Sequence, residues 1–176
     1  MIYVGVDPGT RCTGIAHVEY GGIRFVQALQ ASGGEAMIAV IGRQIRIPGS
    51  GFCFAVEDQE YRHERAKASP ATIFPFAQVA GAAYCVLRQS SDCLGPSFVA
   101  PMTWKGSVPK LQHHRRLLTK LGWGWEERGG KEPYCVPLLF GTIGAPKGWQ
   151  DIKPAQWREV LDAIGIALYL QEKSCG

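Results

Sequence analysis

The chain has 176 residues, of which 46% are hydrophobic, with a formal net charge of +4 at pH 7 and a pI near 8.8. This length allows one domain with a substantial core and excludes two domains of ordinary size, so we expect residues 1–176 to form a single domain. The mild positive charge permits a polyanionic partner without requiring one.

The six cysteines include no C-x-x-C pair and no Cys/His cluster at zinc spacing. We therefore expect free thiols in a reduced, cytoplasmic setting. No apolar run reaches ~18 residues, the length that a membrane-spanning helix needs, and the N-terminus lacks a basic region followed by an apolar segment. These patterns favour a protein with no membrane span and no export signal.

The first predicted element is an apolar, β-branched strand that begins at Ile2 and ends at Asp7, where Pro8 and Gly9 follow. The side chain of Asp7 is thus presented at the end of a strand. Its ordinary interpretation is a turn residue, because Asp-Pro-Gly is a common turn sequence. The alternative is a metal ligand, which requires partner ligands from other elements.

Two further strands, over 13–20 and 23–26, are predicted around the turn signal Gly21-Gly22. Apolar residues at three- and four-residue intervals then predict a helix that ends near Pro48. Residues 52–56 form another apolar run, which ends in Glu57 and Asp58. The pattern of the first strand, an apolar run closed by an acid, is therefore repeated.

A polar, charged loop over 59–69 precedes an Ala-rich helix predicted over 72–89. Pro75 is tolerated only in the first helical turn, so this helix is predicted to begin within a residue or two of it. Gly81 lies among alanines and gives the helix a thin face, which the sheet or a second subunit could approach closely.

A short strand over 97–101 and a loop at 104–106 lead to a basic helix over 110–121. His113 and His114 in this helix lack a metal-ligand spacing and are predicted to lie on the surface. Residues 122–152 form an unassigned insertion, since they hold seven glycines and three prolines. A structureless loop of this length is uncommon in a compact domain, so we expect a small hairpin or a DNA-facing flap.

The last predicted helix begins at Pro154 and runs to Glu172. It carries Glu159 and Asp162, which share a face because they are three residues apart. Glu159 also has the simpler interpretation of an exposed residue paired with a cation. Asp162 lies among apolar residues, where an unpaired buried carboxylate is costly, so it calls for a partner or a ligand.

This order of elements and acids resembles that of RuvC-type Holliday-junction resolvases. Residues 4–14, VGVDPGTRCTG, are similar to the opening motif of that family, 54–57 to its second acidic motif and 162–168 to its C-terminal Asp-Ala motif. Trp104-Lys105-Gly106 and Pro109-Lys110 resemble the lysine-bearing segment of the smaller, phage-type members. The resemblance implies an α/β, ribonuclease-H-like fold, with a mixed five-stranded sheet flanked by helices.

The resemblance also implies hydrolysis of a phosphodiester by two divalent ions about 3.5–4 Å apart. Mg²⁺, or alternatively Mn²⁺, takes oxygen ligands, and Asp7, Glu57, Glu159 and Asp162 supply four carboxylates. We expect Asp7 to bridge the ions, with Glu57 on one side and Asp162 on the other. The family usually has Asp or His at the place of Glu159. Asp58, next to Glu57, is a backup candidate for a metal ligand.

Basic residues near these acids are candidate DNA contacts. Lys105 is expected to act in catalysis and to bind phosphate together with Lys110, and Arg115 and Arg116 to extend the phosphate-binding surface. The simpler interpretation is a solvated basic surface. By the resemblance, an aromatic in the 59–69 loop enters the centre of the junction; Tyr61, beside Arg62, is the candidate, and Trp123 is an alternative.

The implied function is a metal-dependent endonuclease that resolves four-way DNA junctions by paired symmetric nicks. A symmetric junction favours a homodimer with one active site per subunit. Such a protein would act in a bacterial cytoplasm, or in that of the host cell if phage-encoded. The alternatives are a related nuclease for other branched DNA or RNA–DNA hybrids, and a catalytically inactive junction-binding module. Actin-like and sugar-kinase folds begin similarly but need a second domain and a second phosphate loop.

Overall fold

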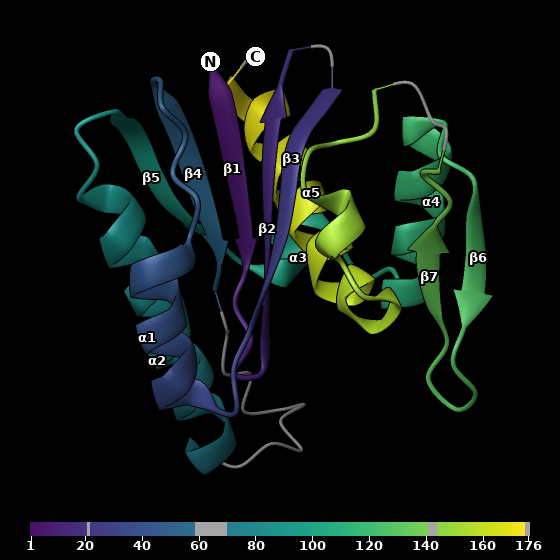
Figure 1. Cartoon of the computed structure of the whole chain (residues 1–176), viewed down its shortest axis with the longest axis horizontal. Coiled ribbons are helices and arrows are strands. Elements are labelled where there is room, and N and C mark those ends of the chain that lie inside the picture. Colours follow the sequence, from purple (N-terminus) through teal and green to yellow (C-terminus); the bar gives the residue numbers. More distant parts are fainter. Residues whose placement is uncertain (21, 59–69, 141–143, 175–176) are drawn as a thin grey trace.

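A computed structural model describes residues 1–20, 22–58, 70–140 and 144–174 (Figure 1). Its centre is a five-stranded sheet in the order β3-β2-β1-β4-β5. Strand β1 (Ile2–Asp7) pairs antiparallel with β2 (Cys12–Glu19), which pairs antiparallel with β3 (Gly22–Gln30). On its other side β1 runs parallel to β4 (Phe52–Glu57), and β4 runs parallel to β5 (Cys93–Val99). The predicted mixed sheet is confirmed.

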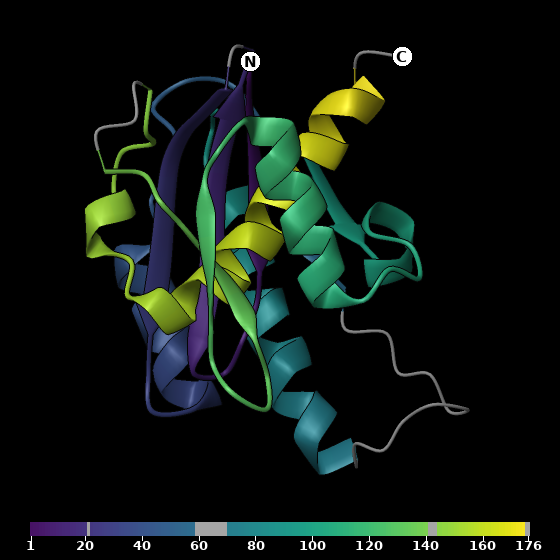
Figure 2. The ribbon, with the colours of Figure 1, turned by 90° about the vertical axis from the view of Figure 1, so that its right-hand side faces the viewer.

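Helices cover both faces of the sheet (Figures 1 and 2). Helices α1 (Gly34–Gln44) and α2 (Pro70–Arg88) pack on one face. The other face is covered by α5 (Trp157–Ser174), which follows two short 3₁₀ turns, η1 (Trp149–Asp151) and η2 (Pro154–Gln156). Outside α5 lie α3 (Pro101–Trp104), α4 (Lys110–Leu121) and a hairpin of β6 (Trp125–Arg128) and β7 (Tyr134–Pro137).

Alternation along the strands decides which face receives each acid. Val4 and Val6 of β1 pack in the core beneath α1 and α2. Successive side chains of a strand point to opposite faces, so Gly5 and Asp7 face α5. Strand β4 has the same pattern, because Phe54 and Val56 enter the core beneath α1 and α2, and Ala55 packs on the other face against Ile166 of α5. Glu57 follows two residues after Ala55, and so it also belongs to the face that α5 covers.

Two glycines let α5 lie directly on the sheet. A Cβ on Gly5 would overlap the carbonyl oxygen of Ala163 and would lie 2.6 Å from the backbone nitrogen of Ala167. A Cβ on Gly14 of β2 would overlap the carbonyl oxygen of Glu159. Both obstacles are backbone atoms, which cannot turn aside as the end of a side chain can. The glycines therefore set the distance between α5 and the strands that carry the acids.

Several sequence-based boundaries are wrong. Strand β3 continues to Gln30, four residues beyond its predicted end at 26. Helix α2 begins at Pro70, so Pro75 lies inside it and not in its first turn. Strand β5 begins at Cys93, and Pro101 starts α3 where a strand end was predicted. At both helix starts a proline takes one of the first positions, where its missing N–H removes no helical hydrogen bond.

The unassigned insertion contains a hairpin, as predicted, made by β6 and β7. Cys135 and Val136 of β7 join the buried cluster that includes Leu118 of α4 and Leu161 of α5. The hairpin is therefore part of the packed domain and holds α4 against α5.

Part of the thin face of α2 packs in the core, because Ala80 and Ala83 are buried. A Cβ on Gly81 would meet no atom of the described residues within 4 Å, so the sheet does not make the close approach that this face permits. A second subunit on this face stays a prediction.

Of the helices that the structure describes, none combines the length and apolarity that crossing a bilayer requires. Cysteines 12, 53, 85, 93 and 135 are free thiols, and Cys175 lies outside the described residues.

The contact of α5 with the sheet can be tested at Gly5. We expect Gly5→Ala to lower the free energy of unfolding by about 1–3 kcal/mol or more, because an added methyl group in a packed interior forces backbone shifts. Urea denaturation measures this change. The matched control is Gly42→Ala, at an exposed position of α1 where a Cβ meets no described atom within 4 Å. The control should raise the stability by up to about 1 kcal/mol, as alanine does inside helices. Equal stability of Gly5→Ala and wild type would contradict the packing argument.

Candidate active site

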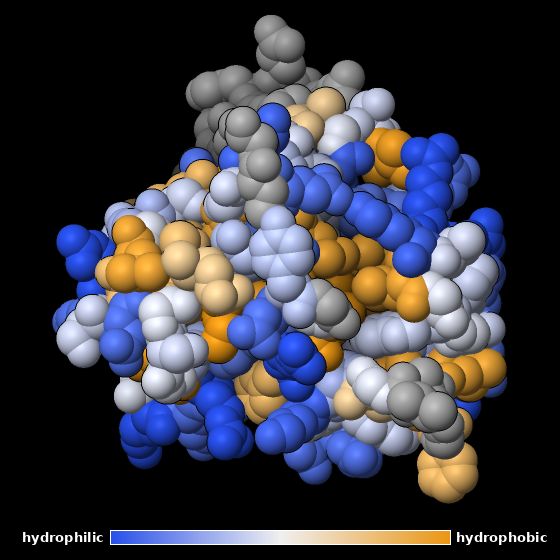
Figure 3. Space-filling view, turned by 90° about the horizontal axis from the view of Figure 1, so that it is seen from above, coloured by the Kyte–Doolittle hydropathy of each residue, from blue (hydrophilic) through white to orange (hydrophobic). Residues whose placement is uncertain are grey.

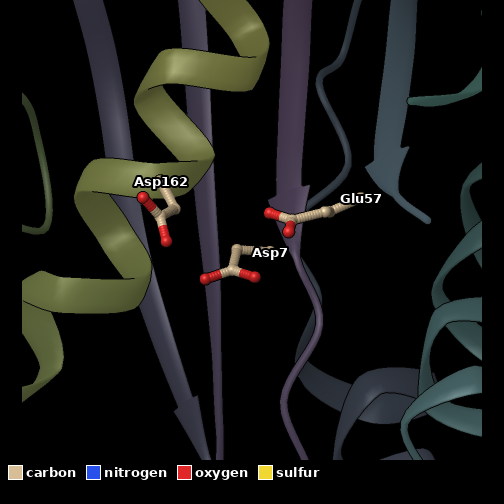
Figure 4. A group of neighbouring side chains, drawn as sticks. All are labelled: Asp7, Glu57 and Asp162. Carbon is tan, nitrogen blue, oxygen red and sulfur yellow. The ribbon is translucent and has the colours of Figure 1, made fainter. Parts of the chain in front are cut away.

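Three buried carboxylates converge at the ends of β1 and β4. Asp7, Glu57 and Asp162 are 7%, 5% and 1% exposed, and each offers an oxygen within 4.8 Å of the others. Figure 4 shows them pointing toward one another, with Asp7 between the other two. The structure thus brings together three of the four carboxylates that the sequence singled out.

The register of the sheet explains the pairing of the first two acids. Val6 is aligned with Val56 in the parallel β1–β4 pair, and Asp7 and Glu57 are the next residues of these strands. Asp162 comes from the second turn of α5, where the helix crosses β1 at Gly5. Residues that are far apart in the sequence therefore form one cluster.

Glu159 lies one turn before Asp162 and lines the same cavity, but it is outside the group of three. It is half-buried, and burial raises the pKa of its carboxyl group. Asp58, the backup candidate, is exposed, and its backbone N–H donates to the carbonyl oxygen of Val99 at 2.8 Å. Asp58 therefore follows the end of β4 and lies outside the cluster of three acids.

The acids face a cavity of about 420 Å³ that also receives cations. The Nζ atom of Lys110 is 2.6 Å from Oδ2 of Asp162. The Nζ atom of Lys105 is 3.8 Å from Oε1 of Glu57 and 4.8 Å from the centre of the Trp104 ring. Both lysines line the cavity, so the negative charge of the cluster is partly neutralised by the predicted basic residues.

The prediction that His114 lies on the surface is wrong. Its ring is buried, 1% exposed, and Nε2 is 2.8 Å from Oδ1 of Asp162. Asp162 has a lowered pKa and is ionised, so the nitrogen donates and the carboxylate accepts. The relevant signal in the sequence was the spacing from Lys110, because residues four apart share a helix face. His113 is half-buried beside the Trp104 ring, with ring centres 4.9 Å apart.

The acids differ in how their charge is accommodated. Burial, reinforced by Asp162, raises the pKa of Asp7 well above its ordinary value. Burial also raises the pKa of Glu57, to about 7, although Lys105 opposes this shift. Burial would raise the pKa of Asp162 too, but the hydrogen bond from His114 and the charge of Lys110 hold it below its ordinary value. Without a cation, burial and mutual repulsion therefore oppose the joint ionisation of the three carboxylates.

The donor set fits a divalent cation. All three members of the cluster offer carboxylate oxygen, the ligand type that Mg²⁺ and Mn²⁺ prefer. Oε2 of Glu57 is buried and has no hydrogen-bond partner in the part of the chain that the structure describes. A buried oxygen in this condition is costly unless something binds it.

The remaining predicted DNA contacts lie elsewhere. Arg115 binds Glu127 of β6 at 2.7 Å and so ties α4 to the hairpin. Arg116 is exposed and lines a separate cavity of about 180 Å³ next to Trp104. Trp123 packs against the core beneath the hairpin. Tyr61 and Arg62 lie outside the described residues.

Arg11 and Phe76 were not among the predicted site residues, yet both line the acidic cavity. Arg11 follows directly on the Asp-Pro-Gly-Thr turn, which was a usable signal. That turn is closed by Thr13, whose hydroxyl donates to the carbonyl of Gly9 at 3.1 Å and accepts from its N–H at 3.2 Å. Phe76 reaches the cavity only because α2 packs beside β4. The local sequence pattern does not predict this packing.

Solved structures share this fold over nearly their whole length. Thermus thermophilus RuvC in complex with a Holliday junction substrate matches with a TM-score of 0.56 at 16% identity, covering 99% of this chain and 95% of that one. A second T. thermophilus RuvC structure gives 0.54 at 17% identity, covering 99% and 96%. The Fowlpox virus resolvase with its substrate Holliday junction DNA gives 0.53 at 13% identity, covering 100% of both chains. The predicted ribonuclease-H-like fold of the RuvC type is confirmed.

At the level of sequence, no family model matches this chain, and no curated protein does.

The raised pKa of Glu57 predicts how stability depends on pH when divalent ions are removed with EDTA. Between the ordinary value of 4.5 and about 7, the folded state binds more protons than the unfolded state, so the free energy of unfolding falls as pH rises. The part due to Glu57 is roughly 3 kcal/mol at most. We expect Glu57→Gln to remove this part, and hence to be more stable than wild type at pH 8.

Urea denaturation from pH 4.5 to 8 measures the effect, with Glu35→Gln, at an exposed position of α1, as the matched control. Asp7 acts in the same direction, so a weaker slope should persist in Glu57→Gln. If Glu57→Gln has the same pH dependence of stability as wild type and the same stability at pH 8, burial does not raise the pKa of Glu57.

Proposed function

We propose that this protein is a metal-dependent endonuclease that resolves four-way DNA junctions. The observation that supports this most strongly is the buried cluster of Asp7, Glu57 and Asp162, which opens into a cavity lined by two lysines. The fold adds support, because two structures with this architecture hold Holliday junction DNA. Junction resolution is therefore the reaction that accounts for both the fold and the carboxylate cluster.

In this proposal the three carboxylates, with Glu159 as a fourth, hold two Mg²⁺ or Mn²⁺ ions. When bound, such ions activate a water for attack on phosphorus and stabilise the leaving oxygen. Asp7 lies between Glu57 and Asp162, so it is the residue placed to serve both ions (Figure 4). The pairing of Asp7 and Glu57 at two adjacent strand ends fixes their separation without help from mobile loops.

Lys105 and Lys110 orient the scissile phosphate. Both reach the cavity from the chain that runs from α3 into α4, and both lie close to an acid of the cluster. An ammonium group in such a place balances the carboxylates and offers hydrogen bonds to phosphate oxygens. Arg11 is a third cation at the cavity wall and would extend this contact along the backbone of the DNA.

The nucleic acid approaches the end of the sheet where β1 and β4 finish. The opposite end, where β1 begins, is seen in Figure 3, and there hydrophilic side chains dominate with apolar ones in small groups between them. The carboxylate cluster does not open on that end, since Asp7 is the last residue of β1. The DNA-binding surface is thus assigned to the end that carries the cavity.

Paired symmetric nicks require two active sites, so we include a homodimer in the proposal. The candidate contact is α2 at Gly81, where a Cβ would meet no described atom within 4 Å, although Ala80 and Ala83 beside it are buried in the core.

The decisive variant is Asp7→Asn, which keeps the shape of the side chain and removes its charge. We expect wild type to place paired nicks in a labelled, immobile four-way junction when Mg²⁺ is present. The variant should lose on the order of 10³-fold in cleavage rate, because several kcal/mol of transition-state stabilisation are removed. Junction affinity, measured by gel shift in Ca²⁺, should stay close to that of wild type.

The matched control is Asp92→Asn, at an exposed position before β5, which should cut as wild type does. Flap and RNA–DNA hybrid substrates are cut in parallel. Faster cutting of either substrate than of the junction would replace junction resolution with the corresponding activity. Equal cleavage by wild type and Asp7→Asn would contradict the proposed chemistry.

A further inference from the structure

We propose that His114 is a positioning residue that holds the carboxylate of Asp162 in place for metal binding. This inference rests on the proposed function. Helix α4 would then contribute more than the phosphate contact proposed for Lys110, because His114 binds Asp162 from the side away from the cavity.

The two oxygens of Asp162 are held by different residues. Oδ1 accepts from Nε2 of His114 at 2.8 Å, and Oδ2 accepts from Nζ of Lys110 at 2.6 Å. Lys110 lines the acidic cavity and its side chain is 36% exposed, whereas that of His114 is 1% exposed and lies outside the cavity lining. Oδ1 is therefore anchored inside the protein, and Oδ2 is the oxygen presented to the cavity.

The turn of α4 that carries the histidine packs against α5. A Cβ on Gly165 would lie 2.5 Å from the Trp104 ring and 3.1 Å from Nε2 of His113, so the bare backbone of α5 at this position lets both aromatic rings pack against it. The rings of Trp104 and His113 meet edge to face, at 83°. Because His113 is the neighbour of His114, this packing fixes the part of α4 from which His114 reaches Asp162.

The consequence for the site is geometric. A carboxylate with only Lys110 as partner could rotate about its side-chain bonds and follow the flexible ammonium group. A second, buried donor on the other oxygen removes that freedom and keeps Oδ2 directed toward the cavity. Hydrogen-bonding partners of metal ligands contribute about 10- to 100-fold in metal affinity or activity.

The test compares His114→Leu, which removes the donor, with His114→Gln, which puts an amide nitrogen three bonds from Cβ, as Nε2 is. Mn²⁺ binding to the full chain without DNA is measured by calorimetry. We expect His114→Leu to weaken Mn²⁺ binding about 10- to 100-fold, and His114→Gln to restore most of the affinity. Junction cleavage at subsaturating Mn²⁺ should fall in parallel, with the KM for DNA unchanged.

The matched control is His17→Leu. His17 is also buried, 6% exposed, and its Nε2 donates to the carbonyl oxygen of Arg46 at 3.0 Å, remote from the acids in the fold. This variant loses a comparable hydrogen bond but should bind Mn²⁺ as wild type does. If His114→Leu does not fold, His114→Asn replaces it, since its amide is one bond too short to reach Oδ1 in the same way.

The outcomes separate the two proposals. Wild-type Mn²⁺ affinity in folded His114→Leu or His114→Asn, together with junction cleavage by wild type, overturns the positioning role and leaves the proposed function standing. Equal weakening by His17→Leu and His114→Leu also overturns the role, because it would show a general cost of losing a buried histidine. A wild-type protein that neither binds Mn²⁺ nor cuts the junction overturns both proposals.

Discussion

The close contact of α5 with β1 and β2 is the constraint on which the site depends. Gly5 and Gly14 remove the side chains that would keep the helix away, and the backbone of α5 occupies the space they leave. This contact puts Asp162 beside Asp7, while the parallel register of β1 and β4 puts Glu57 beside Asp7. The cluster is therefore a product of backbone packing, in which rigid elements set the positions of the carboxylates.

Gathering these acids in a buried place has an electrostatic cost, since like charges at short range disfavour joint ionisation. The fold offsets part of this cost with Lys110 and His114 on Asp162, and with Lys105 near Glu57. The raised pKa values of Asp7 and Glu57, for which burial is the main cause, show that compensation is incomplete. A divalent cation bound to these carboxylates would relieve the residual strain, so the feature that weakens the fold is the one that the proposed function needs.

Sequence reasoning located Asp7, Glu57 and Asp162 because each breaks a local rule, an acid closing an apolar strand or interrupting an apolar helix. Periodicity and turn residues predicted most of the strands, since these are local signals, whereas the mixed five-stranded sheet followed from the resemblance to RuvC-type resolvases. Sequence reasoning failed for His114, whose role depends on α4 lying against α5, and for Phe76, which reaches the cavity only through tertiary packing. The predicted start of α2 near Pro75 is wrong, because Pro70 begins the helix and Pro75 is accommodated inside it.

The central claim is that the three carboxylates form a site for divalent cations. It is tested most directly by a crystal structure of the protein with Mn²⁺, using anomalous scattering to locate the ions. Our account predicts two anomalous peaks about 3.5–4 Å apart, both in contact with Asp7, with Glu57 near one and Asp162 near the other. Ordered side chains in the same arrangement, with no anomalous peak between them at millimolar Mn²⁺, would contradict it.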